Sequence, residues 1–191
     1  MQRTFIAFKC KDEQEILIKE LIAQGQNIYK NDISWTNPEN IHFTFQFIGD
    51  TKDSDLPIIS DYLKNLAQIC RPFSLFDCNL KWYPFKNSPL ICLMYRFHNS
   101  FLIKQHHLLN NFLKDLEYPI EDRHLNFHLT LARLKKNFDS EQIIWNDQLI
   151  QMLINIEIDK LIYYKSTLLP QGPTYECISA YDLKGGQNVH R

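Results

Sequence analysis

Two short stretches with one shared pattern decide the fold: Ile41-His42-Phe43-Thr44-Phe45-Gln46-Phe47-Ile48-Gly49 and Phe127-His128-Leu129-Thr130-Leu131-Ala132-Arg133. Polar and apolar residues alternate in each, which is typical of a β-strand with one buried face. Residues two apart lie on the same side of a strand. We therefore expect the His and Thr of each stretch to share a face. The apolar residues, including all three phenylalanines of the first stretch, should lie on the other face.

The bulk composition limits the classes of protein to consider. The 191 residues are 45% apolar and 23% charged, which suits one domain or two small lobes. A net charge of −1 provides no overall field for a polyanion, so any nucleic acid would be bound locally. Five cysteines without a close pair argue against a disulfide framework or a zinc ribbon, and we expect buried thiols in a reducing cytoplasm. We find no signal peptide pattern and no apolar run of membrane-spanning length.

Outward from the two stretches, the patterns predict two consecutive halves. The first is strand–helix–strand–helix–strand, and the second is strand–helix–strand–helix–strand–strand. The predicted strands are 3–10, 41–49, 73–85, 90–97, 127–133, 156–168 and 175–183. The predicted helices begin at Asp12 with a capping box to Glu15 and a stop at Gly25, at Ser54 and Pro57, at Ser100, and at Asp139 or Ser140. Residues 27–40 are expected to form a loop, and residues 185–191 a disordered tail.

Two His-x-Thr strands facing each other would place two imidazoles and two hydroxyls in one cleft. Two histidines suit acid–base catalysis at phosphorus, where one neutral ring accepts a proton from water and one imidazolium protonates the leaving oxygen. Imidazole has a pKa near the working pH with little tuning. In-line displacement places the attacking and leaving oxygens on opposite sides of phosphorus. The threonine hydroxyls can donate to the non-bridging oxygens.

A single His-x-Thr strand is most simply a half-buried histidine beside a β-branched residue, so the argument depends on the pair. A zinc site competes, but a catalytic zinc usually has three protein ligands and no third ligand is spaced near either motif. We therefore expect no metal. Arg133 closes the second stretch. Strict alternation places it opposite His128, so Arg133 reaches the cleft only if the strand bends or ends there.

The two stretches resemble the motifs of the 2H phosphoesterase superfamily, and within it the RNA 2′,3′-cyclic phosphodiesterase or 2′-5′ RNA ligase family (LigT/ThpR). The resemblance covers nearly the whole chain. Its further parts are Arg3-Thr4-Phe5-Ile6-Ala7, Trp35 with Pro38-Glu39-Asn40, Arg71-Pro72-Phe73, Tyr83-Pro84-Phe85, and Leu161 to Ser166 followed by Pro170-Gln171-Gly172-Pro173-Thr174-Tyr175. Two departures are Phe127, where the family often has Pro, and the glycine-free stretch 79–83, which could alter the lip of the cleft.

The resemblance implies an α+β fold with two lobes, each an antiparallel sheet with helices outside, related by a pseudo-twofold axis about a central cleft. Residues 1–184 would form this single bilobal phosphodiesterase domain. It implies His42 and His128 as the catalytic pair, Thr44 and Thr130 as phosphate-binding residues, and Arg133 as a substrate-binding residue. His42 would protonate the leaving 3′ oxygen, and His128 would activate water.

The implied reaction opens a 2′,3′-cyclic phosphate at an RNA end to a 2′-phosphate without a cofactor, with possible reverse 2′-5′ ligation. Expected partners are RNA ends or small nucleoside 2′,3′-cyclic phosphates, with no membrane, and the chain is expected to act as a monomer. Three alternatives stay open: a 2′-5′ oligonucleotide phosphodiesterase, a non-catalytic module that binds RNA ends, and a structural domain with histidines as core fillers.

Overall fold

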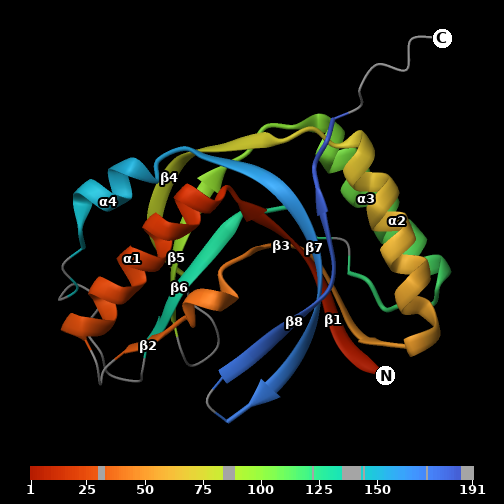
Figure 1. Cartoon of the computed structure of the whole chain (residues 1–191), viewed down its shortest axis with the longest axis horizontal. Coiled ribbons are helices and arrows are strands. Elements are labelled where there is room, and N and C mark those ends of the chain that lie inside the picture. Colours follow the sequence, from red (N-terminus) through yellow and green to blue (C-terminus); the bar gives the residue numbers. More distant parts are fainter. Residues whose placement is uncertain are drawn as a thin grey trace.

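The computed structural model describes residues 1–29, 33–83, 89–121, 123–134, 143, 145–170 and 172–185. Helices are interspersed among the strands along the chain, as Figure 1 shows. The strands are β1 (Gln2–Cys10), β2 (Ile33–Trp35), β3 (Phe43–Thr51), β4 (Phe73–Tyr83), β5 (Leu90–Arg96), β6 (His128–Leu134), β7 (Ile156–Leu169) and β8 (Gly172–Asp182). The helices are α1 (Asp12–Ile28), α2 (Leu56–Ile69), α3 (Ser100–Asp115) and α4 (Asp147–Met152), with short 3-10 turns η1 (Pro38–Asn40) and η2 (Asp53–Asp55). The strand β5 directly follows β4, and β8 directly follows β7.

The strands pair antiparallel in the order β2-β6-β5-β4-β7-β1-β3, and β8 pairs with β7 beside this path. This path falls into two halves that meet at β4. The start of β4 pairs with β7, and the rest of β4 pairs with β5. We call β3-β1-β7-β8 the first sheet and β2-β6-β5-β4 the second sheet. The expected α+β class with two antiparallel sheets is therefore confirmed.

The strand β4 changes partners within a few residues. Phe73 to Leu75 pair with β7, and the pairing with β5 is irregular between Phe76 and Asn79. Between these points Asp77 has a φ of 53°, and its carbonyl accepts a hydrogen bond of 2.8 Å from the Asn79 side chain. A left-handed residue of this kind is uncommon outside glycine, although Asp tolerates it better than most residues. The two sheets are thus joined through one locally distorted strand.

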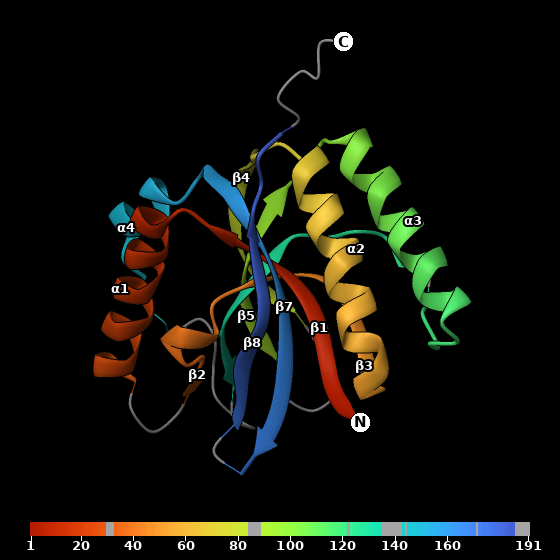
Figure 2. The same cartoon turned by 45° about the vertical axis from the view of Figure 1, so that its right-hand side comes forward.

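The helices cover the outside of the sheets. In Figures 1 and 2, α2 and α3 lie side by side at one end of the molecule, and α1 and α4 lie at the other. The helix α2 contacts β7 and β8, α3 contacts β3, and α1 contacts β2 and α4. Tyr62 of α2 stacks on Phe112 of α3 with ring centroids 4.3 Å apart. Apolar side chains beneath these helices form one large core that includes Ile6, Phe8 and Phe43.

The predicted order of elements is confirmed, but several boundaries are wrong. The expected loop 27–40 contains the end of α1, the short strand β2 and the turn η1. The N-cap of α1 is Lys11 without a side-chain cap, because the carboxylates of the expected capping box bind lysines instead. Asn99, not Ser100, caps α3. The expected helix start at residues 139–140 and the tail residues 186–191 lie outside the described residues, and α4 is capped by Asn146.

The five cysteines are free, but they do not share one environment. Cys10, Cys70 and Cys92 are buried, Cys78 is half-buried and Cys177 is exposed. The expectation of buried thiols is therefore wrong for Cys177. Within the described residues, no helix is long and apolar enough to cross a membrane.

Gly25 does not end α1, which continues for three more residues. A Cβ atom built at Gly25 would lie 2.1 Å from the indole of Trp35, so only glycine allows β2 to approach the helix this closely. The helix contacts β2 along this stretch. The glycine is explained by this close approach rather than by a turn.

We therefore predict that Gly25→Ala destabilises the protein, although Ala is ordinarily favoured over Gly in a helix by about 1 kcal/mol. Overpacking against the indole should lower the free energy of unfolding by about 1–3 kcal/mol. Urea unfolding measures this, with the exposed Asn27→Ala as control. The loss should shrink when Trp35→Leu is added. Unchanged or raised stability in Gly25→Ala would contradict the packing argument.

Candidate active site

The two motif strands have the same irregularity at the same place. On β3, Thr44 pairs with Ala7 and Gln46 pairs with Ile6, so Phe45 is an extra residue. On β6, Thr130 pairs with Cys92 and Ala132 pairs with Ile91, so Leu131 is an extra residue. Each is a β-bulge placed directly after the motif threonine. An equivalent bulge in both strands is what the expected pseudo-twofold relation predicts.

A bulge of one residue reverses the alternation that follows it. On β6, Leu131 and Ala132 are both buried, and Arg133 is exposed on the side of His128 and Thr130. The charge of Arg133 acts on the thiol of Cys92, whose sulfur lies 3.7 Å from the Thr130 hydroxyl oxygen. The bulge therefore provides the change of direction that the sequence alone left open, and Arg133 lies on the same face as His128 and Thr130.

The same bulge on β3 makes one expectation wrong. Phe47 does not lie on the buried face with Phe43 and Phe45, because the extra residue Phe45 moves it to the side of His42. Phe47 is 61% exposed, whereas Phe43 and Phe45 are buried. Its ring centroid lies 5.7 Å from that of Phe5, which in turn lies 5.0 Å from the His42 ring. Phe47 thus occupies on β3 the position that Arg133 occupies on β6.

Each histidine is held by a backbone contact two residues earlier in the chain. The Nδ1 atom of His42 lies 2.6 Å from the carbonyl oxygen of Asn40. A carbonyl only accepts, so Nδ1 carries the hydrogen and Nε2 is left for a substrate. His128 has a corresponding backbone hydrogen bond to Asn126. The repeated unit is therefore Asn-x-His-x-Thr-x-x-Phe or Arg. An alignment of the two His-x-Thr motifs that began two residues before each histidine would have revealed the shared asparagine.

Aromatic rings surround His42. The rings of Phe5, Tyr175 and Tyr164 lie 5.0, 5.3 and 6.4 Å from it, with Tyr175 edge-on. Burial lowers the pKa of His42 to about 4, opposed by the hydrogen bond to Asn40 and assisted by the charge of His128. Burial also lowers the pKa of His128. Both rings are therefore neutral at neutral pH when the site is empty.

The two sheets bring their motif faces together. The charge of His128 acts on His42 although the residues come from different sheets, and β3 contacts β6 without hydrogen bonds between them. The Tyr175 ring of the first sheet contacts the His42 ring. Burial raises the pKa of Tyr175, and the positive charge of Arg133 from the second sheet opposes this rise. A Coulomb interaction of this kind falls with distance, so these contacts indicate that the two motif faces lie near each other.

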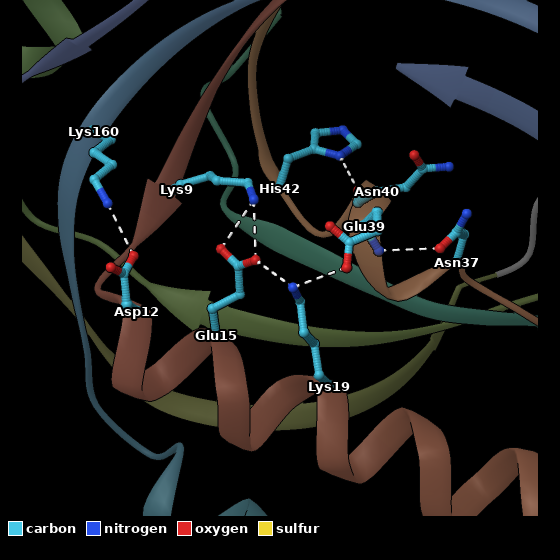
Figure 3. A network of polar contacts seen from close by, with 9 residues as sticks. All are labelled: Lys9, Asp12, Glu15, Lys19, Asn37, Glu39, Asn40, His42 and Lys160. Carbon is cyan, nitrogen blue, oxygen red and sulfur yellow. Dashed lines mark hydrogen bonds and ion pairs between the residues drawn. The ribbon is translucent and has the colours of Figure 1, made fainter. Parts of the chain in front are cut away.

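A chain of polar contacts holds the turn η1 that precedes His42, as Figure 3 shows. Lys9 of β1 lies 3.0 and 3.1 Å from the two carboxylate oxygens of Glu15, and this pair is largely shielded from solvent. Lys19 lies 3.1 Å from Glu15 and 3.1 Å from Glu39 of η1. These contacts connect β1, helix α1 and the turn whose last residue binds His42.

The same turn is also attached to β8. The Asn40 side chain donates a 2.7 Å hydrogen bond to the carbonyl of Pro173, and Asn37 accepts one of 3.1 Å from the backbone N–H of Glu39. The backbone oxygen that orients the His42 ring is therefore fixed from two sides. Sequence reasoning did not assign this role to Asn40.

A cavity of about 430 Å³ is lined by the residues that directly precede His128 in the chain and by the end of β5. Its lining includes Asn126, Phe127, Arg96 and His98. Its described lining residues do not include either motif histidine. Within the described ranges, no three His, Cys, Asp or Glu side chains are arranged to hold a metal ion. The candidate site comprises the two imidazoles, the two motif hydroxyls, Arg133 and the aromatic rings of the first sheet.

The half-buried, neutral His42 ring predicts a pH dependence of stability. A histidine in the unfolded chain binds a proton near pH 6.5, but folded His42 does so only near pH 4. Between these values the unfolded state carries more protons, so stability falls as the pH falls. The variant His42→Asn should lose this contribution. Urea unfolding of both proteins between about pH 4.5 and 7 tests it, and a stability difference that is constant across this range would contradict it.

A family model described as LigT-like phosphoesterase matches residues 13–76. An RNA 2′,3′-cyclic phosphodiesterase of Thermotoga maritima is 27% identical over 193 residues, covering 96% of this chain and 97% of the relative. A protein of the same name from Methanocaldococcus jannaschii is 28% identical and covers 86% of this chain and 93% of its own length.

Solved structures share the fold. TT0787 of Thermus thermophilus superposes with a TM-score of 0.71 at 20% identity, covering 97% of this chain and 99% of the other. Escherichia coli LigT, solved with 3′-AMP, superposes with a TM-score of 0.67 at 18% identity, covering 96% and 98%. The fold and the full-length relatives agree, and the chain is similar over nearly its whole length to LigT-like phosphoesterases.

Proposed function

We propose that the chain is an RNA 2′,3′-cyclic phosphodiesterase that converts 2′,3′-cyclic phosphate ends to 2′-phosphates without a metal. The observation that carries the proposal is that β3 and β6, the strands of His42 and His128, contact each other although they belong to different sheets. The names of the full-length relatives support the same activity. Residues 1–184 would act as one domain, as a monomer in the cytoplasm.

The two imidazoles divide the proton transfers. His128 takes a proton from the attacking water as the new P–O bond forms, and His42 gives a proton to the 3′ oxygen as the P–O3′ bond breaks. Burial keeps His42 neutral in the empty site. An anionic phosphate next to the ring favours the imidazolium and raises its pKa. Substrate binding would therefore supply the charge state that the acid needs.

The remaining polar groups would hold the phosphate. The hydroxyls of Thr44 and Thr130 stand two residues after each histidine on the same face, where they can donate to the non-bridging oxygens. Arg133 adds a positive charge on that face of the second sheet. In the reverse direction a 5′-hydroxyl replaces water, the histidines exchange roles, and a 2′-5′ linkage forms.

Phe47 would hold the base of the terminal nucleotide. Its ring is exposed on the side of His42 and rests against Phe5. Aromatic rings stack on any base, which suits an enzyme that reads an RNA end rather than a sequence. Arg133 on β6 would then bind the phosphate of the nucleotide, and Phe47 at the equivalent position of β3 would bind its base.

The first prediction for this function is that the chain hydrolyses a cyclic-phosphate-terminated oligonucleotide in the presence of EDTA. His42→Ala and His128→Ala should each lower kcat about 100- to 10,000-fold, because each removes one proton transfer. His107→Ala, an exposed histidine of α3, is the matched control. Near-normal turnover in either site variant would refute the two-histidine mechanism, and binding without turnover in the wild type would favour a binding module.

A second prediction concerns Phe47→Ala. Loss of base stacking should weaken binding by about 1–3 kcal/mol, seen as a higher KM for nucleoside 2′,3′-cyclic phosphates. Phe47→Tyr should retain most of the affinity, and Phe101→Ala on the outside of α3 is the control. The difference from wild type should disappear with a cyclic phosphodiester that lacks a base. An equal loss on that substrate would show that Phe47 supports the fold instead.

A further inference from the structure

The pairing of the second sheet places Lys81 next to the phosphate-binding residues. Lys81 of β4 pairs directly with Cys92 of β5, and Cys92 pairs directly with Thr130 of β6. Directly paired residues share a face of the sheet. The contact of 3.7 Å between the Cys92 sulfur and the Thr130 hydroxyl oxygen confirms the shared face for this pair. Lys81 and Thr130 therefore lie in one row across the sheet, about 10 Å apart at Cβ.

Lys81 also differs in charge environment from several other cations on these faces. Lys9, Lys160 and Arg96 each lie within 3.3 Å of a carboxylate, and these carboxylates belong to Glu15, Asp12 and Asp77 respectively. Arg3 has Asp50 as its direct cross-strand partner. Lys81 is exposed, its cross-strand partner is a thiol, and no carboxylate of the described chain forms an ion pair with it.

An ammonium group without a nearby carboxylate is suited to bind an anion that the site does not already hold. The chain as a whole has a net charge of −1 and would not attract a polyanion over long range. Affinity for a second phosphate must then come from a local cation. Cys92, which lies between Lys81 and Thr130 in this row, is buried at 1% exposure. Lys81 is therefore the exposed polar residue at the β4 end of the row.

We propose that Lys81 binds the phosphodiester on the 5′ side of the terminal nucleotide, so that the site prefers oligonucleotide ends to mononucleotides. The inference rests on the proposed function, because it takes the terminal phosphate to lie between the motif residues. The RNA strand would leave the site across β5 toward β4. Lys81 would be a specificity-determining residue and would take no part in the proton transfers.

Binding of reaction products tests the inference separately from catalysis. A trinucleotide with a 2′-phosphate end and a nucleoside 2′-phosphate are titrated into wild type, Lys81→Ala, Lys81→Arg and Lys104→Ala. The wild type should bind the trinucleotide more tightly, and Lys81→Ala should reduce this gain about fivefold, the upper range for an exposed ion pair. Lys81→Arg should restore it. Lys104→Ala removes an equal charge from the outside of α3 and should match the wild type.

Salt dependence supplies a second readout. Removing one phosphate contact to a single strand should reduce the slope of log affinity against log salt by about 0.7 for the trinucleotide. Equal length dependence in Lys81→Ala and Lys104→Ala would overturn the inference, as would a wild type that does not distinguish the two ligands. Loss of the length dependence in Arg3→Ala instead would direct the strand over the first sheet. Absence of turnover, in contrast, would count against the proposed function alone.

Discussion

One extra residue in each motif strand determines the composition of the site. The bulges at Phe45 and Leu131 reverse the pleat immediately after Thr44 and Thr130. Without them, an arginine and a phenylalanine would face the apolar core, where a charge is costly to bury. With them, the His, the Thr and the third residue after the Thr lie on one face of each strand. The site is therefore built from a backbone irregularity that two strands share, and not from loops.

The sequence was sufficient for the longer helices and strands and for the motif faces up to the threonines, but not for the short elements β2 and η1. Alternation in the two stretches correctly placed both His/Thr pairs, because a strand buried on one side must follow the period of two. It failed for Phe47 because the bulge leaves no mark in residue type: the extra residue Phe45 stands between Thr44 and Gln46, so the polar–apolar alternation continues unbroken in the sequence. Gly25 was misread for a related reason. Its neighbour Trp35 lies on another element, so local signals cannot reveal the close approach.

Helix caps were predicted less well, and tertiary contacts explain this. The carboxylates of Asp12 and Glu15 have the spacing of a capping box, but Lys160 and Lys9 from neighbouring strands bind them. An ion pair with an adjacent strand competes with the helix N-terminus for the same oxygens. The resulting network reaches the turn before His42, so a local rule fails where the chain uses those charges to support the site.

The shared strand β4 has a consequence for the distance between the two motif histidine rings. His42 and His128 belong to sheets that the described hydrogen-bond ladders connect through β4, and the partner change occurs around Asp77 with its left-handed backbone. The backbone conformation of Asp77 therefore helps to set the orientation of one sheet relative to the other. The gap between the two imidazoles thus depends on a residue that belongs to neither motif strand.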